Sequence, residues 1–143
     1  MIQPIDRIYK FCAYQDRSVY ETRLKIRSLK IQEMNEDQLI DRLIADKFLD
    51  DVRFAQHFVQ GKMNAKGWGV AKIKQGLFQK GIPESIIKEV LREIDETQYL
   101  DNLKREIQKW EKVNDMNAQT KPKLIRFLMS KGYSYDQVIN EIE

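Results

Sequence analysis

The stretch that decides the fold runs from Phe48 to Ile82 and reads FLDDVRFAQHFVQGKMNAKGWGVAKIKQGLFQKGI. Its capping and helix-breaking residues are typical of helices. Either Asp50 or Asp51 suits the N-terminal cap of a helix, because the side chain of each can accept hydrogen bonds from the first free amides. The Gly-Trp-Gly segment at 67–69 breaks the apolar periodicity, and Gly81 suits the position just after a helix. The stretch therefore predicts two helices joined by a short turn.

The same stretch concentrates positive charge. No Asp or Glu occurs from residue 52 to residue 83. The whole chain has a formal charge of only +3, so the residues outside this window sum to −3. A positive field of this kind attracts an acidic partner such as nucleic-acid phosphates. The basic residues of the window are Arg53, Lys62, Lys66, Lys72, Lys74 and Lys80.

A shift of 51 residues brings this stretch onto the C-terminal part of the chain. The KGI sequence at 80–82 then falls on KGY at 131–133, and FLD at 48–50 falls on YLD at 99–101. The opposite shift extends the echo into the N-terminal part. Self-similarity at a fixed period is typical of repeat proteins. We therefore predict three units, at 1–49, 50–96 and 97–143.

Helix caps also punctuate the flanking sequence. Ser18-x-x-Glu21 and Ser134-x-x-Gln137 are capping boxes, and Asn35 can cap a further helix. Strand-like alternation and the Asn-Gly or Asp-Gly turns of hairpins are absent from the sequence. We predict an all-α chain of three tandem three-helix repeats that form an elongated, curved array. Each unit is too small for a large core, so neighbouring units must share surfaces.

Periodicity also predicts which side chains point inward. Pro83 is expected at the first position of a helix, where its missing N–H is not needed. Two helical faces are predicted to be apolar throughout. One consists of Val52, Ala55, Phe58, Val59 and Met63, and the other of Leu124, Phe127 and Leu128.

Composition narrows the class of protein. Hydrophobic residues make up 42% and charged residues 33%, as in globular chains. The single cysteine, Cys12, excludes an internal disulfide and is interpreted as a small core residue. No apolar run reaches the roughly 18 residues that span a bilayer. We expect a soluble, cytoplasmic protein that does not enter a membrane.

The sequence indicates no catalytic or metal site. Asp50 and Asp51 precede an apolar helix, which favours capping over paired catalytic carboxylates. His57 is predicted to be exposed, and one His with one Cys cannot build a structural zinc site. Phosphate-binding glycine loops and nucleophile elbows are absent. We expect a protein without enzymatic activity or cofactor, and an enzyme lacking any known motif is kept only as a third alternative.

Three segments together resemble the RecX family, the regulators of the RecA recombinase. They are FLDDxRFA at 48–55, KGWGxxKIxxxL at 66–77 and KGI at 80–82. The SxxE box at 18–21 and KGY at 131–133 add to the match. The resemblance covers nearly the whole chain, and the combined string is specific.

The resemblance implies both a fold and a function. It implies tandem three-helix repeats without enzymatic activity. It also implies a monomer that binds RecA filaments. This monomer would bind single- or double-stranded DNA through contacts with the DNA backbone. Binding would lower ATP hydrolysis and strand exchange in homologous recombination, DNA repair and the SOS response. The first repeat departs from the family pattern, because Leu29-Lys30 stands where Lys-Gly is expected.

The basic residues and the tryptophan each have two interpretations. A run of lysines is either a solvated face or part of a track that follows phosphates. Trp68 either fills the core at a helix junction or stacks on a base. We predict that filament or DNA contacts come from the basic window together with Trp68, Arg23, Lys25, Arg27, Lys123, Arg126 and Lys131. The alternative function is a helical nucleic-acid-binding module without a recombinase partner.

Overall fold

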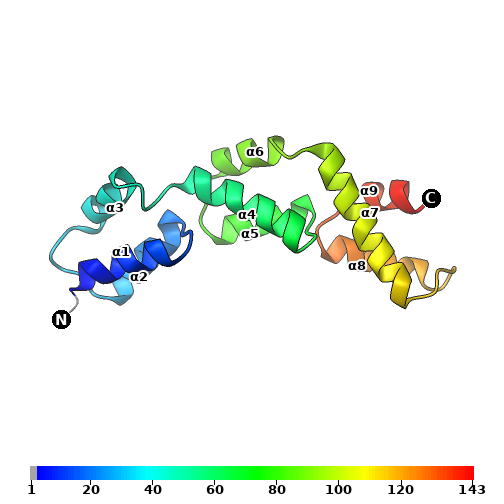
Figure 1. Cartoon of the computed structure of the whole chain (residues 1–143), viewed down its shortest axis with the longest axis horizontal. Helices are drawn as coiled ribbons and strands as arrows, with labels where there is room; N and C mark the ends of the chain where they lie inside the picture. Colours follow the sequence, from blue (N-terminus) through cyan, green and yellow to red (C-terminus); the bar gives the residue numbers. More distant parts are fainter. Residues whose placement is uncertain (1–2) are drawn as a thin grey trace.

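The structure is a computed structural model that describes residues 3–143, and within this range all regular structure is helical (Figure 1). This confirms the all-α class. In chain order the helices are α1 (Pro4–Tyr14), α2 (Val19–Ser28), α3 (Glu36–Ala45), α4 (Asp51–Ala65), α5 (Val70–Gln79), α6 (Glu84–Arg92), α7 (Glu96–Val113), α8 (Lys121–Ser130) and α9 (Tyr135–Ile142).

The helices lie in three groups along a curved, elongated molecule (Figure 1). The groups are α1–α3, α4–α6 and α7–α9, and the two termini lie at opposite ends of the long axis. The predicted elongated array of three-helix repeats is therefore confirmed. The expected boundary after residue 96 falls at the first residue of α7.

Side-chain caps set most helix starts where the sequence predicts them. The boxes Ser18–Glu21 and Ser134–Gln137 form in full at α2 and α9. Asp50 accepts the Arg53 amide at the start of α4. Pro83 differs by one position from the prediction, because it is the N-cap residue and α6 begins at Glu84.

The same backbone conformation ends the second helix of each group. Gly81 and Gly132 follow α5 and α8 with φ of +71° and +108°. Lys30, the equivalent position after α2, has φ of +53° although it carries a Cβ. A left-handed conformation costs a non-glycine residue roughly 1–2 kcal/mol. The first repeat thus ends its second helix with the same left-handed conformation as the other two repeats, despite its Leu29-Lys30 sequence.

Buried apolar side chains form two separate clusters. The first belongs to the α1–α3 group and includes Cys12, as predicted. The second is continuous through α4–α9, so that the second and third groups share one core. The first group therefore contributes nothing to the larger cluster.

Two residues of the predicted apolar faces are exposed instead. Val52 is 37% exposed because it lies in the first turn of α4, beside an open depression lined by Ile44 and Ile86. Phe127 is 40% exposed because it lines an open pocket between α7 and α8, whereas its neighbours Leu124 and Leu128 are buried in the core. Those two predictions were wrong.

Candidate nucleic-acid interface

The candidate interface is built at the joint where α8 ends against the start of α5. The Gly69 amide donates to the Lys131 carbonyl at 2.7 Å, and the Ala71 amide donates to the Gly132 carbonyl at 3.0 Å. A Cβ on Gly69 would lie 2.3 Å from the Gly132 carbonyl carbon. Two backbones are therefore in direct contact, and only glycine fits at position 69.

Two buried tyrosines close the same joint. The Tyr133 hydroxyl donates to the Gly67 carbonyl at 2.9 Å, and the Val70 amide donates to the Tyr99 hydroxyl oxygen at 2.8 Å. The two rings lie 5.4 Å apart. Burial raises the pKa of both Tyr99 and Tyr133, so both phenols stay neutral and keep their hydrogen bonds at neutral pH.

Trp68 lies at this joint, and two lysine ammonium groups lie close to its ring. One comes from α4, before Trp68 in the sequence, and the other from α5, after it. Lys62 Nζ is 4.9 Å and Lys72 Nζ is 4.5 Å from the ring centroid. The Phe58 ring meets Trp68 edge-on at 6.3 Å, and the tryptophan is half-buried against the large cluster. Cation–π attraction of this kind contributes about 0.5–1 kcal/mol at exposed sites. Trp68 thus both packs at the junction and gathers positive charge.

A buried carboxylate holds further lysines beside it. The Glu106 side chain is 6% exposed and pairs with Lys131, and with Lys109 at 3.4 Å. Gly67, with φ of +68°, lies against it, and a Cβ there would come within 2.5 Å of Glu106 Oε1. The loop that carries Lys66 is therefore drawn against α7.

We call the set Lys62, Lys66, Trp68, Lys72 and Lys131 the lysine seam. The structure brings these five predicted residues together from α4, α5, their connecting loop and the end of α8. Three of the four lysines are anchored by an aromatic ring or a buried carboxylate. The seam therefore combines two ammonium groups beside the Trp68 ring with a third that Glu106 holds.

The other predicted basic residues lie elsewhere. Lys74 is exposed on α5, and Lys123 and Arg126 are exposed on α8. Lys25 Nζ lies 5.6 Å from the Phe11 ring. Two more belong to the joint between the first and second groups: Lys80 pairs with Glu21 at 3.3 Å, and Arg53 approaches Asp16 at 3.9 Å.

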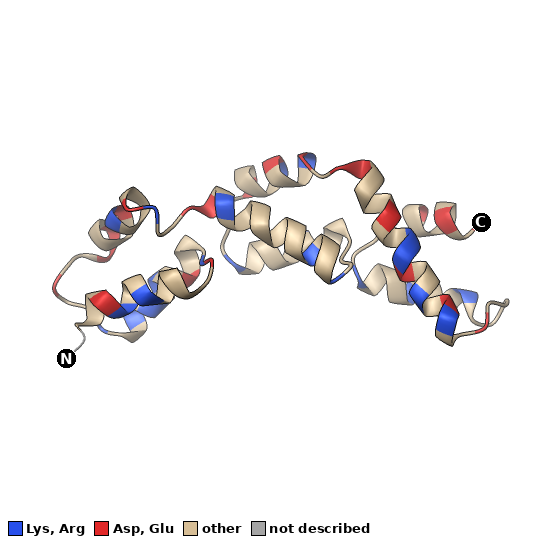
Figure 2. Cartoon of the chain, viewed as in Figure 1, with Lys and Arg blue, Asp and Glu red and all other residues tan. Residues whose placement is uncertain are grey.

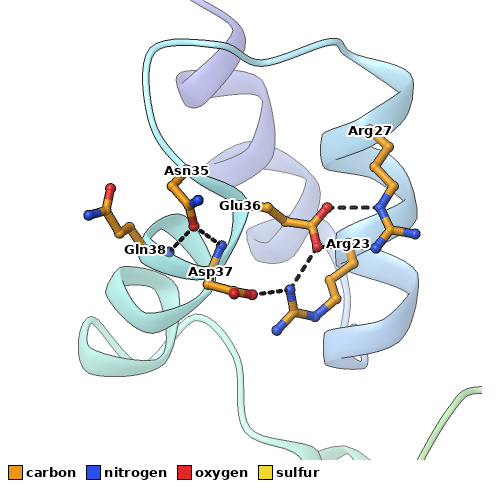
Figure 3. Close-up of polar contacts among 6 residues, drawn as sticks. All are labelled: Arg23, Arg27, Asn35, Glu36, Asp37 and Gln38. Atoms are coloured by element: carbon orange, nitrogen blue, oxygen red, sulfur yellow. Dashed lines mark hydrogen bonds and ion pairs between the residues drawn. The ribbon is translucent and has the colours of Figure 1, made fainter.

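The basic face of α2 is largely neutralised (Figure 3). Arg23 contacts Glu36 and Asp37 at 2.7 Å each, and Arg27 contacts Glu36 at 2.8 Å. The hydrogen bonds from Arg27 and Arg23 lower the pKa of Glu36 below its usual value. The acid-free run on α2 is thus matched by acids at the start of α3, which a search along one helix cannot detect.

Sequence reasoning missed Lys109, because the search looked for runs without acid. α7 carries both signs of charge along its length (Figure 2). Lys109 follows Glu106 by three residues, a spacing that places both on one helix face. That spacing was the available signal.

The described part of the chain contains no helix long and apolar enough to cross a membrane. Fold and seam together define a class: a helical-repeat protein with a basic, aromatic joint between two of its units. Comparison with known proteins gives the particular family. The family description "RecX, second three-helix domain" matches residues 50–91.

Whole-chain relatives extend this match. Regulatory protein RecX of Clostridium tetani is 36% identical over 138 residues, which cover 94% of this chain and 60% of that protein. Regulatory protein RecX of Chlorobium phaeobacteroides is 30% identical over 128 residues, which cover 90% of this chain and 83% of that one. The chain belongs to the RecX family. It spans between 47% and 60% of the length of the first three curated relatives it matches.

Solved structures agree with the fold. The crystal structure of RecX from Lactobacillus salivarius has a TM-score of 0.78 and 27% identity, and the match covers 97% of this chain and 94% of that one. A second crystal structure, of a regulatory protein RecX, has a TM-score of 0.82 at 23% identity and supports the fold alone.

Proposed function

We propose that this chain regulates a RecA–DNA filament as a non-enzymatic, cytoplasmic monomer that needs no cofactor. Two findings support the proposal. The chain belongs to a family whose named members are regulatory proteins. The lysine seam carries the rest of the argument, because it gathers ammonium groups beside Trp68 at a joint built from glycine backbone and buried tyrosines.

The proposed mechanism is occupation of the filament groove. An elongated, curved chain can follow a groove and touch several protomers, while the seam contacts phosphates of the bound DNA. Lysine contacts to phosphate give affinity without reading sequence. The chain then shifts the filament toward an inactive state only to the extent that it binds that state more tightly. ATP hydrolysis and strand exchange fall as a consequence.

The test is ATP hydrolysis by RecA on single-stranded DNA, measured as this chain is added. We expect inhibition at protein levels too low to coat the DNA. The proposal fails if inhibition appears only when the DNA is coated, because competition for bare DNA would then explain the effect.

The second candidate is a nucleic-acid-binding module without a recombinase partner. Lys66, Lys123 and Arg126 favour it, since all three are exposed. In that case the affinity for single-stranded DNA accounts for everything the chain does. Its logarithm should fall with log salt by about 0.7 for each phosphate contacted. Inhibition of RecA would then follow DNA occupancy at every salt concentration.

A further inference from the structure

An open pocket lies between α7 and α8, next to the lysine seam, with a volume of about 450 Å³. Trp110, Val113 and Phe127 line its walls. Lys66, Lys109 and Lys131 surround it, and Glu106 lies beside them. We call this the α7–α8 pocket.

Its apolar walls are left uncovered by the fold. Val113 is 80% exposed and Phe127 is 40% exposed, although Leu103 and Ile107 on α7 and Leu124 and Leu128 on α8 are buried. Trp110 packs partly against the large cluster and so holds one wall in place. The pocket therefore offers a fixed aromatic surface to solvent.

The equivalent space in the second group is filled. Gly76 lies on α5 at the position equivalent to Phe127, and the Phe58 ring packs so closely that a Cβ on Gly76 would come within 2.7 Å of it. Shifted by 51 residues, Phe58 becomes Lys109. In the third group, Lys109 thus takes the place of the Phe58 ring. Phe127, which is partly exposed, takes the place of Gly76. The exchange empties the space and places positive charge at its edge.

The pocket carries a net positive charge, and two of its lysines are held in place by an ion pair with Glu106. Three ammonium groups stand against one carboxylate, which leaves a net positive pocket. Glu106 is buried and binds both Lys131 and Lys109, which keeps them at the rim. Lys131 Nζ also lies 5.7 Å from the Phe127 ring centroid. An aromatic surface beside fixed ammonium groups matches a nucleotide, which brings a flat base and a phosphate together.

We propose that the α7–α8 pocket binds one unstacked base of single-stranded nucleic acid. The base packs on Phe127 and Trp110, and the flanking phosphates contact Lys66 and Lys109. The inference rests on the proposed function, since it names the part of the DNA that the third group holds. An acidic peptide with an apolar anchor is the competing occupant, but its carboxylates and backbone present no flat ring at the spacing of a nucleotide.

Trp110 is the natural probe. The chain has two tryptophans, so Trp68→Phe leaves Trp110 as the single tryptophan, whose emission can be excited apart from that of the tyrosines. In this background the full-length chain is titrated with an oligothymidylate and with an abasic oligonucleotide of equal length. Both ligands carry the same phosphates. We expect the oligothymidylate to quench Trp110 and to bind about tenfold more tightly, because its bases can stack on the aromatic walls and the abasic oligonucleotide has none to stack.

Phe127→Ala should abolish this preference and leave the weaker, phosphate-dependent binding intact. The matched control is Phe78→Ala, which removes a ring that is 76% exposed in a different depression, on α5. Phe78→Ala should keep the tenfold preference. Circular dichroism of both variants establishes that they are folded.

Equal affinities for the two oligonucleotides, or a preference that survives Phe127→Ala, would overturn the proposal. So would stronger quenching by an Asp-Asp-Phe-Asp-Asp peptide than by the oligothymidylate. Inhibition of RecA is measured separately with the unmodified chain. A chain that inhibits RecA without a base preference contradicts the pocket alone, and a chain with the base preference that does not inhibit RecA contradicts the proposed function alone.

Discussion

The two joints between the helix groups use equivalent positions and different chemistry. At the joint between the second and third groups, backbone meets backbone, and two buried tyrosines complete the contact. The joint between the first and second groups contains a hydrogen bond and ion pairs. The Val19 amide donates to Asp51 at 2.9 Å, and Lys80 pairs with Glu21 at 3.3 Å.

Asp16 adds further polar contacts to that first joint. Its carboxylate lies 2.5 Å from His57 Nδ1 and 3.9 Å from Arg53. His57 is exposed, as predicted. Surface ion pairs of this kind typically contribute between 0 and 1 kcal/mol each. Neither buried cluster crosses this joint. The cluster of the first group ends at Leu49, and the larger cluster begins at Phe54.

The 51-residue period makes the comparison direct. The Val19 amide and the Val70 amide are equivalent, as are Gly81 and Gly132. The Val19 amide donates to the Asp51 carboxylate, and the Val70 amide donates to the Tyr99 hydroxyl oxygen. We infer that the second and third groups unfold together, whereas the first group can separate from them at lower cost. The lysine seam lies at the more rigid of the two joints.

The largest expected difference comes from the paired glycines. Gly132→Ala places a Cβ 2.6 Å from the Gly69 carbonyl oxygen and 2.7 Å from the Lys72 amide nitrogen. Because both neighbours are backbone in a shared core, we expect a loss of about 3 kcal/mol in the free energy of unfolding. Gly81→Ala meets the Tyr20 side chain instead. The first group can move away, so the loss should stay near the 1–2 kcal/mol of left-handed strain.

Urea unfolding of the two alanine variants measures this difference. Equal losses would mean that the two joints are equally rigid.

A smaller effect is expected at the two acceptors. Tyr99→Phe keeps the ring but leaves the partly buried Val70 amide without its acceptor, which should cost roughly 1–3 kcal/mol. Asp51→Asn keeps an acceptor for Val19 and removes a charge. Burial raises the pKa of Asp51 in the folded chain, so ionisation costs stability as the pH rises above the ordinary value of 3.8.

Asp51→Asn should therefore be neutral or slightly stabilising at pH 7, within about 0.5 kcal/mol. Below pH 3.8, where both folded and unfolded carboxyls are protonated, it should have no effect. Thermal unfolding of both variants at the two pH values is the measurement. A large loss from Asp51→Asn at pH 7 would show that its charge stabilises the joint.

The smallest effect is expected at the neutralised face of α2. Arg27 and Arg23 lower the pKa of Glu36, so the ion pairs stabilise the fold above the ordinary pKa of 4.5. This contribution is lost as the pH falls through the folded pKa. Glu36→Gln should cost up to about 1 kcal/mol at pH 7, because the pair is near the surface.

The cost of Glu36→Gln should disappear well below pH 4.5. Stability curves of the parent chain and this variant between acid and neutral pH test the point. A cost that is independent of pH would mean that Glu36 acts through packing rather than charge.

Much of the fold was predictable from local rules. Caps at Ser18, Asp50 and Ser134 and the glycine at 81 depend on neighbours in sequence, so they could be read directly. The exposure of Phe127 could not, because it depends on where α7 crosses α8. A helical wheel contains no information about the neighbouring helix.

The candidate site was less predictable for the same reason. Lys62, Lys66 and Lys72 were found as a run without acid, and their gathering around Trp68 became visible only in three dimensions. Arg23 and Arg27 belong to a similar run, yet acids from α3 neutralise them. Charge along one helix therefore identifies candidates but not their environment.

That contrast provides the most direct test of the lysine seam. Two double variants remove the same charge: Lys62→Gln with Lys72→Gln, and Arg23→Gln with Arg27→Gln. Inhibition of RecA-driven ATP hydrolysis on single-stranded DNA is measured for both, after their melting temperatures have been checked. We predict that the lysine pair raises the protein concentration needed for half-inhibition by about tenfold or more, since losing a charge-assisted hydrogen bond costs roughly 1.5–3 kcal/mol. The arginine pair should change it little. Equal effects of the two double variants, or full inhibition without Lys62 and Lys72, would contradict a functional role for the seam.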